Sequence, residues 1–163
     1  MDIPKDITAT MGEFIYPQNT YMQTYKPTLK GHQNQIKKAC EAIMNATRPI
    51  AYIGGGAISS NSADLVREFI KKTNIPAVLT LMALGVLEKN DPCNLGMVGM
   101  HGSYAANMAI SEADLIIAFG ARFDDRVTGN VSEFAKSAKI IHIDIDPSSI
   151  GKIINADYPI VGD

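Results

Sequence analysis

The sequence has few of the features that mark membrane, secreted or nucleic-acid-binding proteins. It contains no tryptophan and only two cysteines, Cys40 and Cys93, which lack the CxxC spacing of zinc sites. The longest apolar run, Leu115 to Gly120, is far shorter than the roughly 18 residues of a membrane span. The net charge is −2 and no run of four basic residues occurs, so we expect no nucleic acid and no membrane as partner. A small-molecule ligand and a cytoplasmic location are the expectation, although an organellar transit peptide could precede these residues.

The composition is that of one ordinary globular domain. Hydrophobic residues make up 46% and charged residues 20% of the 163 residues, which is enough apolar surface for a core. The first thirty residues carry three prolines and no period of 2 or 3.6, which is typical of a linker. We therefore expect residues 1–30 to be the end of a preceding domain and a linker, and residues 31–163 to form a single domain.

Short apolar runs alternate with helical patterns along the rest of the chain. Apolar residues from Ile36 to Met44, including Cys40, recur at helical spacing, and a second helix is predicted over Ser62–Thr73 with Ser60, Asn61 or Ser62 as its N-cap. Several runs are apolar on both faces, which favours a parallel sheet covered by helices on both sides. The predicted class is α/β and Rossmann-like. The predicted strands are Pro49–Ile53, Ala77–Leu81, Asp114–Gly120, Lys139–Ile145 and Tyr158–Val161.

Three consecutive glycines, Gly54, Gly55 and Gly56, follow the first predicted strand and precede a helix. Glycine lets backbone amides and a helix N-terminus approach a phosphate closely, so the pattern indicates a nucleotide site. A tight turn that needs glycine is the alternative. The NAD fingerprint fails, because Ser59 occupies the third glycine position and the strand ending at Thr80 carries no acid for a ribose hydroxyl.

A second glycine-rich segment, from Gly96 to Gly102, holds Met97, Met100 and His101. Methionine is polarizable and packs on aromatic faces, so a flat ring such as a flavin could lie here. The alternative is that both methionines fill gaps in the core, and composition by itself favours that interpretation. His101 is interpreted as a residue of a turn.

The strand that ends at Gly120 runs into a segment rich in charge, with Arg122, Asp124, Asp125 and Arg126 close together. Ligands of open α/β sheets bind beyond the carboxyl ends of the strands. Guanidinium groups suit phosphates, and carboxylates suit ribose or ribityl hydroxyls. A mutual ion-pair cluster on a surface loop is the alternative.

Asp144, near the end of the fourth predicted strand, could bind a ribose hydroxyl in the same way or could cap the strand end. As a metal site, its pairing with Asp146 supplies too few ligands. The sequence has no GxSxG motif, no P-loop and no histidine in a triad or metal-binding pattern. We therefore expect these residues to hold a cofactor and not to catalyse a reaction by themselves.

Several ordered motifs together resemble the catalytic subunits of acetohydroxyacid synthases, and the resemblance covers essentially the whole chain. The most specific of them are LGMVGMHG, ARFDDRVTG, AKIIHIDIDP and DYPIVGD. Others are DIPKD near the start, YIGGGA around the glycine triplet, and LTLM at Leu79–Met82. Departures from the family pattern are small, with Val98 where leucine is common and Ala121 where valine is common.

The resemblance implies the middle, FAD-binding domain of a three-domain subunit cut from a longer enzyme. Thiamine diphosphate and Mg²⁺ would be bound by the other two domains, which would also supply the activating glutamate. The implied reaction is decarboxylation of pyruvate followed by ligation to pyruvate or 2-oxobutyrate, in branched-chain amino-acid synthesis. A homodimeric parent enzyme and a regulatory subunit are further implications. Because the reaction involves no net oxidation, FAD would be a structural requirement.

The resemblance also implies which positions line the FAD, and it reverses the core interpretation of the methionines. These positions are Gly54, Gly55, Gly56, Thr80, Leu81, Met82, Val98, Gly99, Met100, His101, Gly102, Gly120, Arg122, Asp124, Arg126, Val127, Asp144, Ile145 and Asp163.

Two other interpretations compete with this one. The chain could be the middle domain of another thiamine-dependent enzyme, such as a pyruvate oxidase, decarboxylase or carboligase, although ARFDDRVTG speaks against it. It could also be a stand-alone nucleotide-binding module, including the sirtuin type, although the zinc-binding CxxC pairs of that type do not occur.

Overall fold

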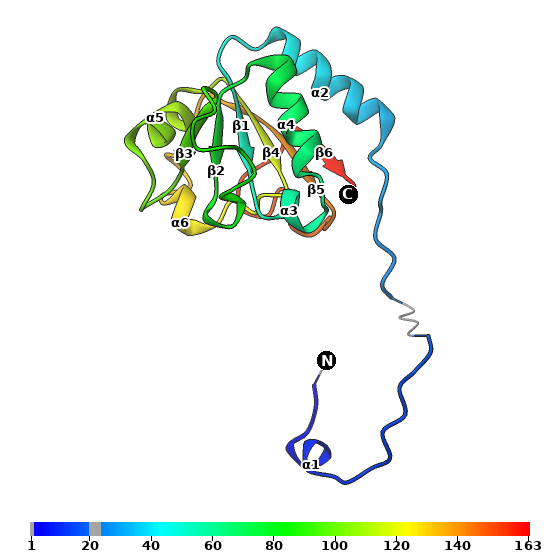
Figure 1. Cartoon of the computed structure of the whole chain (residues 1–163). Helices are drawn as coiled ribbons and strands as arrows, with labels where there is room; N and C mark the ends of the chain where they lie inside the picture. Colours follow the sequence, from blue (N-terminus) through cyan, green and yellow to red (C-terminus); the bar gives the residue numbers. More distant parts are fainter. Residues whose placement is uncertain (1, 20–23) are drawn as a thin grey trace.

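A computed structural model describes residues 2–19 and 24–163, and its centre is a six-stranded sheet (Figure 1). Every neighbouring pair of strands is parallel, in the order β3-β2-β1-β4-β5-β6. In this order the first and fourth strands are neighbours at the centre of the sheet. The first three strands extend toward one end of the sheet, and the last three extend toward the other. The strands are β1 (Pro49–Ile53), β2 (Ala77–Leu79), β3 (Asn94–Met97), β4 (Leu115–Phe119), β5 (Lys139–Asp144) and β6 (Tyr158–Val161).

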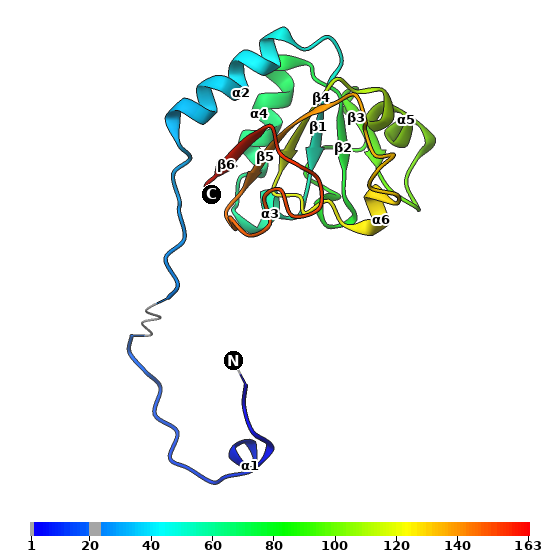
Figure 2. The same cartoon turned by 180° about the vertical axis from the view of Figure 1, so that it is seen from behind.

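Helices cover both faces of the sheet, as Figure 1 and its reverse view in Figure 2 show. One face packs under α2 (Gln33–Asn45) and α4 (Ala63–Thr73), and the other under α5 (Tyr104–Glu112) and α6 (Asp125–Thr128). None of the helices in the described residues is long and apolar enough to cross a bilayer. The remaining short helices are α1 (Lys5–Thr8), α3 (Gly56–Ser59) and the 3₁₀ turn η1 (Leu81–Ala83).

Strand β1 shows why the sheet is buried on both sides. Successive side chains of a strand point to opposite faces. Ala51 and Ile53 lie in the core layer under α2 and α4, whereas Ile50 and Tyr52 lie in the layer that includes residues of α5. A sheet with two buried faces needs apolar side chains at every position, which explains the unbroken apolar runs.

The predicted α/β class and parallel sheet are confirmed, with three local corrections. The predicted strand Ala77–Leu81 ends at Leu79, because Leu81 begins η1. Met44 and Cys40 are exposed, although their spacing placed them in the core stripe of the first helix. Ser62 does precede α4, but its hydroxyl bonds the carbonyl of Ala57 and does not cap the helix.

The sequence prediction missed β3 and α5. Strand β3 contains Gly96, which has a φ of 93° and no side chain to contribute to an apolar pattern. Helix α5 has the sequence YAANMAISE, in which alanines occur on several sides and obscure the helical period.

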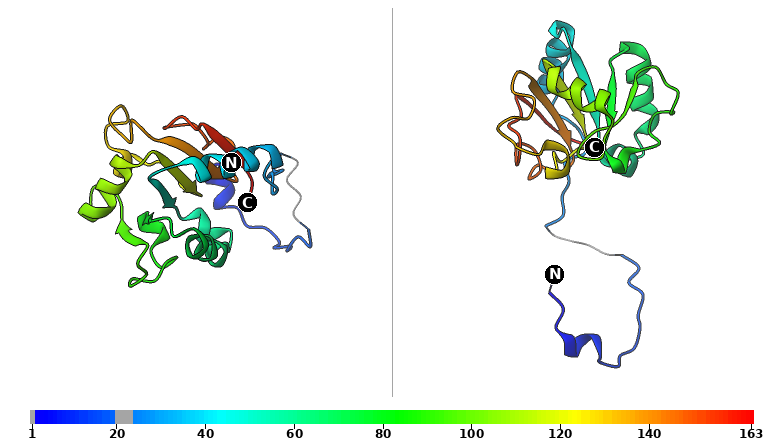
Figure 3. Two further views of the ribbon diagram at one scale, coloured as in Figure 1. Left: turned by 90° about the horizontal axis from the view of Figure 1, so that it is seen from above. Right: turned by 90° about the vertical axis from the view of Figure 1, so that its left-hand side faces the viewer.

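Residues 2–19 lie apart from the sheet and its helices, as Figure 1 and the right-hand view of Figure 3 show. Residues 2–19 are exposed and contain only the single turn of α1, while residues 1 and 20–23 lie outside the described residues. Packing onto the domain begins near Leu29, whose carbonyl oxygen accepts a hydrogen bond of 3.1 Å from the amide of Asp163. A Cβ on Gly31 would stand 2.9 Å from a methyl of Ile160. The part of the chain that packs against the last strand therefore begins near Leu29.

Candidate functional site

The residues just beyond the carboxyl ends of the strands form one continuous edge. The amides of Gly54, Thr80 and Val98 follow β1, β2 and β3, and each bonds the carbonyl of a residue on a neighbouring strand. Gly120 and Gly162 continue the pattern after β4 and β6. Every predicted site residue lies on this edge or on the loops directly after it. The sequence therefore predicted a set of positions that the fold brings together at the edge where α/β sheets bind ligands.

A crevice of about 80 Å³ opens at this edge, where β1 and β4 separate into their loops. Gly56, Gly120, Asp144, Ile145 and Asp163 are among the residues that line it. The end of β5 therefore contributes its acid to the same crevice as Gly56, the last glycine of the triplet that follows β1. The Oδ1 atom of Asp144 accepts a 2.9 Å hydrogen bond from the amide of Asp146.

The glycine triplet packs backbone against backbone with the loop after β4. A Cβ on Gly54 would stand 2.1 Å from the carbonyl oxygen of Gly120, and one on Gly56 would stand 2.7 Å from the Cα of Gly120. The amides of Gly54 and Gly56 bond the carbonyls of Phe119 and Gly120, at 2.9 and 3.1 Å. Two of the three amides are thus committed to the protein, and the helix that follows is only the single turn α3. Close packing of the two loops by itself requires glycine here.

The loop after β4 is anchored by Phe123, whose φ of 54° lies in the left-handed region and whose side chain is 1% exposed. Its ring lies 5.2 Å from that of Tyr52 and 5.1 Å from that of His142, measured between ring centroids. A buried aromatic residue holds this costly conformation only when its surroundings fix it. The anchoring leaves its neighbours Arg122 and Asp124 exposed at the edge.

The charged groups of this loop do not neutralise one another closely. Asp124 caps α6 by accepting a 3.1 Å hydrogen bond from the amide of Arg126. That bond, a hydrogen bond with Asp125 and the charges of both arginines lower the pKa of Asp124. Arg126 approaches Asp125 only to 4.0 Å, and Arg122 forms no ion pair within the described residues. Within the described residues the loop therefore forms one long ion pair and no closed cluster of ion pairs, and both arginines are exposed.

Three apolar side chains are exposed on the segments that follow β2 and β3. Met100 is 69% exposed, and Leu81 and Met82 in η1 are 69% and 72% exposed. The interpretation of Met100 as a core residue is thus wrong, while Met97 on β3 is half-buried. Exposed methionine and leucine side chains offer an adaptable apolar surface beyond the carboxyl ends of the strands.

Two buried polar groups near this edge lack hydrogen-bond partners within the described residues. They are the hydroxyl of Thr80, at the end of β2, and both ring nitrogens of His142 on β5. Burial lowers the pKa of His142, and the nearby backbone of Ala121 and charge of Asp144 offset part of that effect. Sequence reasoning did not single out His142, since a histidine within an apolar strand is indistinguishable there from a packed core residue.

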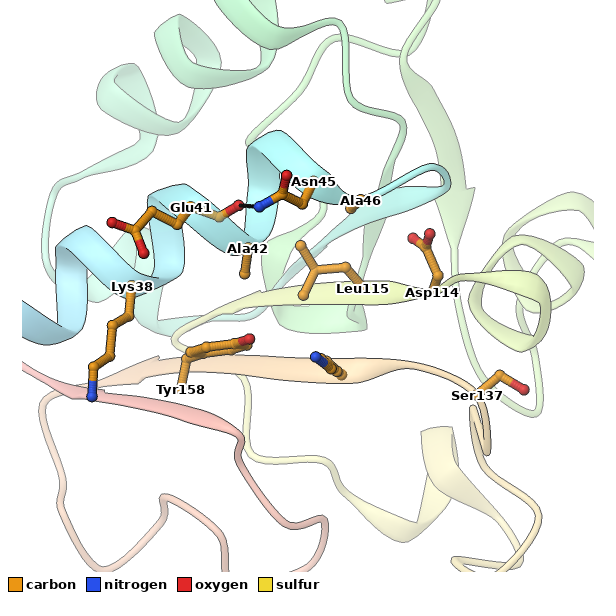
Figure 4. A pocket seen from close by; sticks show the side chains of 10 residues that line it. Lys38, Glu41, Ala42, Asn45, Ala46, Asp114, Leu115, Ser137 and Tyr158 are labelled. Atoms are coloured by element: carbon orange, nitrogen blue, oxygen red, sulfur yellow. Dashed lines mark hydrogen bonds between the residues drawn. The ribbon is translucent and has the colours of Figure 1, made fainter.

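A larger pocket, of about 470 Å³, lies at the opposite edge of the sheet (Figure 4). Lys38 and Glu41 of α2 line it together with Asp114 and Tyr158. The carboxylate of Asp114 is already hydrogen-bonded within the protein, since it accepts hydrogen bonds of 2.7 and 2.9 Å from the amides of Thr47 and Arg48. This edge is where the strands begin, so it is not the expected ligand edge of a parallel sheet. The described residues also contain no cluster of three metal-ligating side chains.

Residues 36–163 match the family model described as thiamine pyrophosphate enzyme, central domain. The chain belongs to this family. The match begins within α2 and ends at the last residue, so the central domain of a thiamine pyrophosphate enzyme comprises all six strands and the whole candidate site.

Full-length relatives of this central domain are large subunits named acetolactate synthase. The chain is 49% identical over 165 residues to the acetolactate synthase large subunit of Buchnera aphidicola subsp. Schizaphis graminum. It is 44% identical to the isozyme 3 large subunit of Escherichia coli K12, also over 165 residues. Both comparisons cover 100% of this chain and 29% of the relative. The protein from Mycobacterium tuberculosis is 47% identical over 163 residues, which are 26% of its length. The chain thus spans less than a third of the length of these relatives.

Proposed function

We propose that this chain is the FAD-holding central domain of an acetolactate synthase catalytic subunit. The observation that carries the proposal is the single crevice at the β1/β4 junction, which combines loop glycines with the Asp144 carboxylate. Exposed guanidinium groups lie on the loop that leaves the same junction. This combination suits a dinucleotide, whose phosphates need cationic donors and whose sugar hydroxyls need a carboxylate.

The residues of the edge fit a flavin dinucleotide in three respects. The exposed guanidinium groups of Arg122 and Arg126 can hold a pyrophosphate. The hydroxyl of Thr80, which has no partner within the described residues, can donate a hydrogen bond to a polar ligand atom or accept one from it. The exposed side chains of Met82 and Met100 offer an apolar surface for a ring. A bound FAD would supply a rigid aromatic group to the edge, and in a reaction without net oxidation its role is structural.

The parent enzyme, under this proposal, decarboxylates pyruvate and ligates the two-carbon unit to a second pyruvate or to 2-oxobutyrate. Thiamine diphosphate and Mg²⁺ are then held by the other domains of the same subunit. We further propose a homodimer in the cytoplasm that associates with a regulatory subunit. The high identity to acetolactate synthase large subunits over the whole chain supports these assignments. Residues 1–30 serve as the connection to the preceding domain.

The proposal is tested on the protein of the full reading frame that contains these residues. We expect a visible flavin spectrum after gel filtration, and formation of acetolactate from pyruvate that depends on thiamine diphosphate and Mg²⁺. A protein that is active but free of flavin would remove FAD from the proposal. A protein that reduces its flavin with pyruvate and consumes oxygen would instead be an oxidase of the same family.

A further inference from the structure

The loop after β3 is held in place by one side chain that no motif singled out. Asn107 lies on α5 and reaches back to Gly99, where its Oδ1 accepts a 2.9 Å hydrogen bond from the amide. Its Nδ2 donates a 3.0 Å hydrogen bond to the Gly99 carbonyl oxygen. Both polar atoms of the half-buried carboxamide are therefore used on a single residue of the loop.

Gly99 needs such a partner because its backbone does not have the conformation of a strand and cannot continue the sheet hydrogen bonds. Its φ is 112°, a region that residues with a side chain rarely adopt. A Cβ at Gly99 would also stand 2.7 Å from the carbonyl oxygen of Arg126. Without Asn107, the buried amide of Gly99 would lose its partner, and the Gly99 carbonyl oxygen would keep only the 2.9 Å hydrogen bond from the amide of Gly102.

The same stretch of backbone joins two parts of the candidate site. The amide of Met100, the residue after Gly99, donates a 2.9 Å hydrogen bond to the carbonyl oxygen of Arg126 in α6. Asn107 thereby fixes the backbone of Gly99 next to the Met100 amide, which is hydrogen-bonded to Arg126. This hydrogen bond joins the β3 loop, with its exposed Met100, to the segment after β4, with its exposed arginines. A shift of Gly99 would change the spacing between the apolar and cationic parts of the edge.

We propose that Asn107 is a positioning residue for the cofactor, setting the distance between the β3 and β4 loops without touching the ligand itself. The inference rests on the proposed function, since it assumes a flavin dinucleotide that contacts both loops. Asn107 is identified by its two hydrogen bonds to Gly99. The residues that the family motifs imply lie on the loops themselves, whereas Asn107 lies on α5.

The first test measures flavin affinity in the full-length protein. Asn107→Ala removes two hydrogen bonds from a fixed loop, so we expect the dissociation constant of FAD to rise about tenfold. Asn107→Asp keeps the acceptor for the Gly99 amide but not the donor to its carbonyl, so its affinity should lie between those of Asn107→Ala and the unaltered protein. The bound-flavin absorbance spectrum should shift in Asn107→Ala, because the ring environment at Met100 changes.

Two variants serve as controls for effects that are not specific to the loop. Val66→Ala removes buried volume from the opposite face of the sheet and lowers stability without contacting either loop. Asn45→Ala removes an exposed carboxamide whose Nδ2 bonds the carbonyl of Glu41 on α2. An equal loss of FAD affinity in Val66→Ala and Asn107→Ala, at an equal loss of stability, would overturn the positioning role.

A second measurement does not depend on flavin. In the ligand-free protein, hydrogen exchange of the Gly99 and Met100 amides should be at least tenfold faster in Asn107→Ala and unchanged in Asn45→Ala. Unchanged exchange in Asn107→Ala would refute the inference even if the protein binds FAD. Faster exchange in a protein that binds no FAD would refute the proposed function and with it the role toward the cofactor, while leaving the contact with Gly99 established.

Discussion

Gly56 and Gly120 meet backbone to backbone where β1 and β4 end. A Cβ on Gly56 would stand 2.7 Å from the Cα of Gly120, and the Gly56 amide bonds the Gly120 carbonyl at 3.1 Å. The two loops that leave the centre of the sheet are therefore locked together, and the crevice opens beside this contact. Glycine is needed here to let the loops approach, whether or not a phosphate also lies against them.

Substitution of Gly56 by alanine should destabilise the domain by about 1–3 kcal/mol, because the added methyl meets backbone that cannot rotate away. The φ of Gly56 is not in the left-handed region, so this variant isolates the steric effect. Gly12→Ala is the matched control, since nothing lies within 4 Å of its position. Urea unfolding of both variants measures the difference, and equal midpoints would contradict the close contact.

Arg122→Ala should weaken FAD binding in the full-length protein by about tenfold or more, because a charge-assisted hydrogen bond to a phosphate is lost. The guanidinium group is exposed and forms no ion pair within the described residues, so its removal should leave the unfolding temperature nearly unchanged. Lys38→Ala removes an exposed cation from the opposite edge and should retain all flavin. Flavin content is read from visible absorbance after gel filtration, and full retention in Arg122→Ala would rule out a phosphate contact there.

His142→Phe should make stability less sensitive to acid. Burial lowers the pKa of His142, so the unfolded chain, with an ordinary pKa of about 6.5, binds the proton more tightly. The stability that His142 contributes is complete above that pH and is lost as the pH falls toward the lower folded pKa. Phenylalanine keeps a ring beside Phe123 and leaves no ring nitrogen without a partner.

The free energy of unfolding should therefore decrease less steeply between about pH 7.5 and 5 for His142→Phe than for the unaltered chain. His32→Gln, which alters an exposed histidine, is the control. Identical slopes for His142→Phe and the unaltered chain would show that protonation of the buried ring does not oppose folding.

Asp114→Asn should lower stability at neutral pH by about 1–2 kcal/mol, because an amide side chain accepts fewer of the hydrogen bonds from Thr47 and Arg48. Burial alone would raise the pKa of Asp114, but these bonds together outweigh it and lower the pKa. The contribution is thus present above the unfolded pKa of about 3.9 and disappears as the pH falls through the folded value. The stability difference between variant and unaltered chain should shrink over that interval, and Asp2→Asn, at an exposed carboxylate, is the control.

The strands were predictable where apolar residues run without interruption. Pro49–Ile53 was predicted at its observed limits, because a strand buried on both faces is apolar at every position. Tyr158–Val161 was also predicted at its limits, although this edge strand is mostly half-buried. Strand β3 was not predictable from its own residues, because its sequence NLGM shows no apolar run or alternation and it becomes a strand by pairing with β2. Helix α5 was missed for another reason: its alanines include the exposed Ala105 and the buried Ala106, so the sequence shows no clear apolar period.

The sequence by itself determined the parallel α/β class, the family, and the set of loop residues that carry charge and glycine. Each of these follows from local patterns that a chain contains before it folds. Only the tertiary structure decided that Phe123 is buried with a left-handed backbone, that Met100 is exposed, and that Asn107 holds Gly99. These relationships join segments brought together by strand order, and no spacing along the chain specifies which side chain meets which loop.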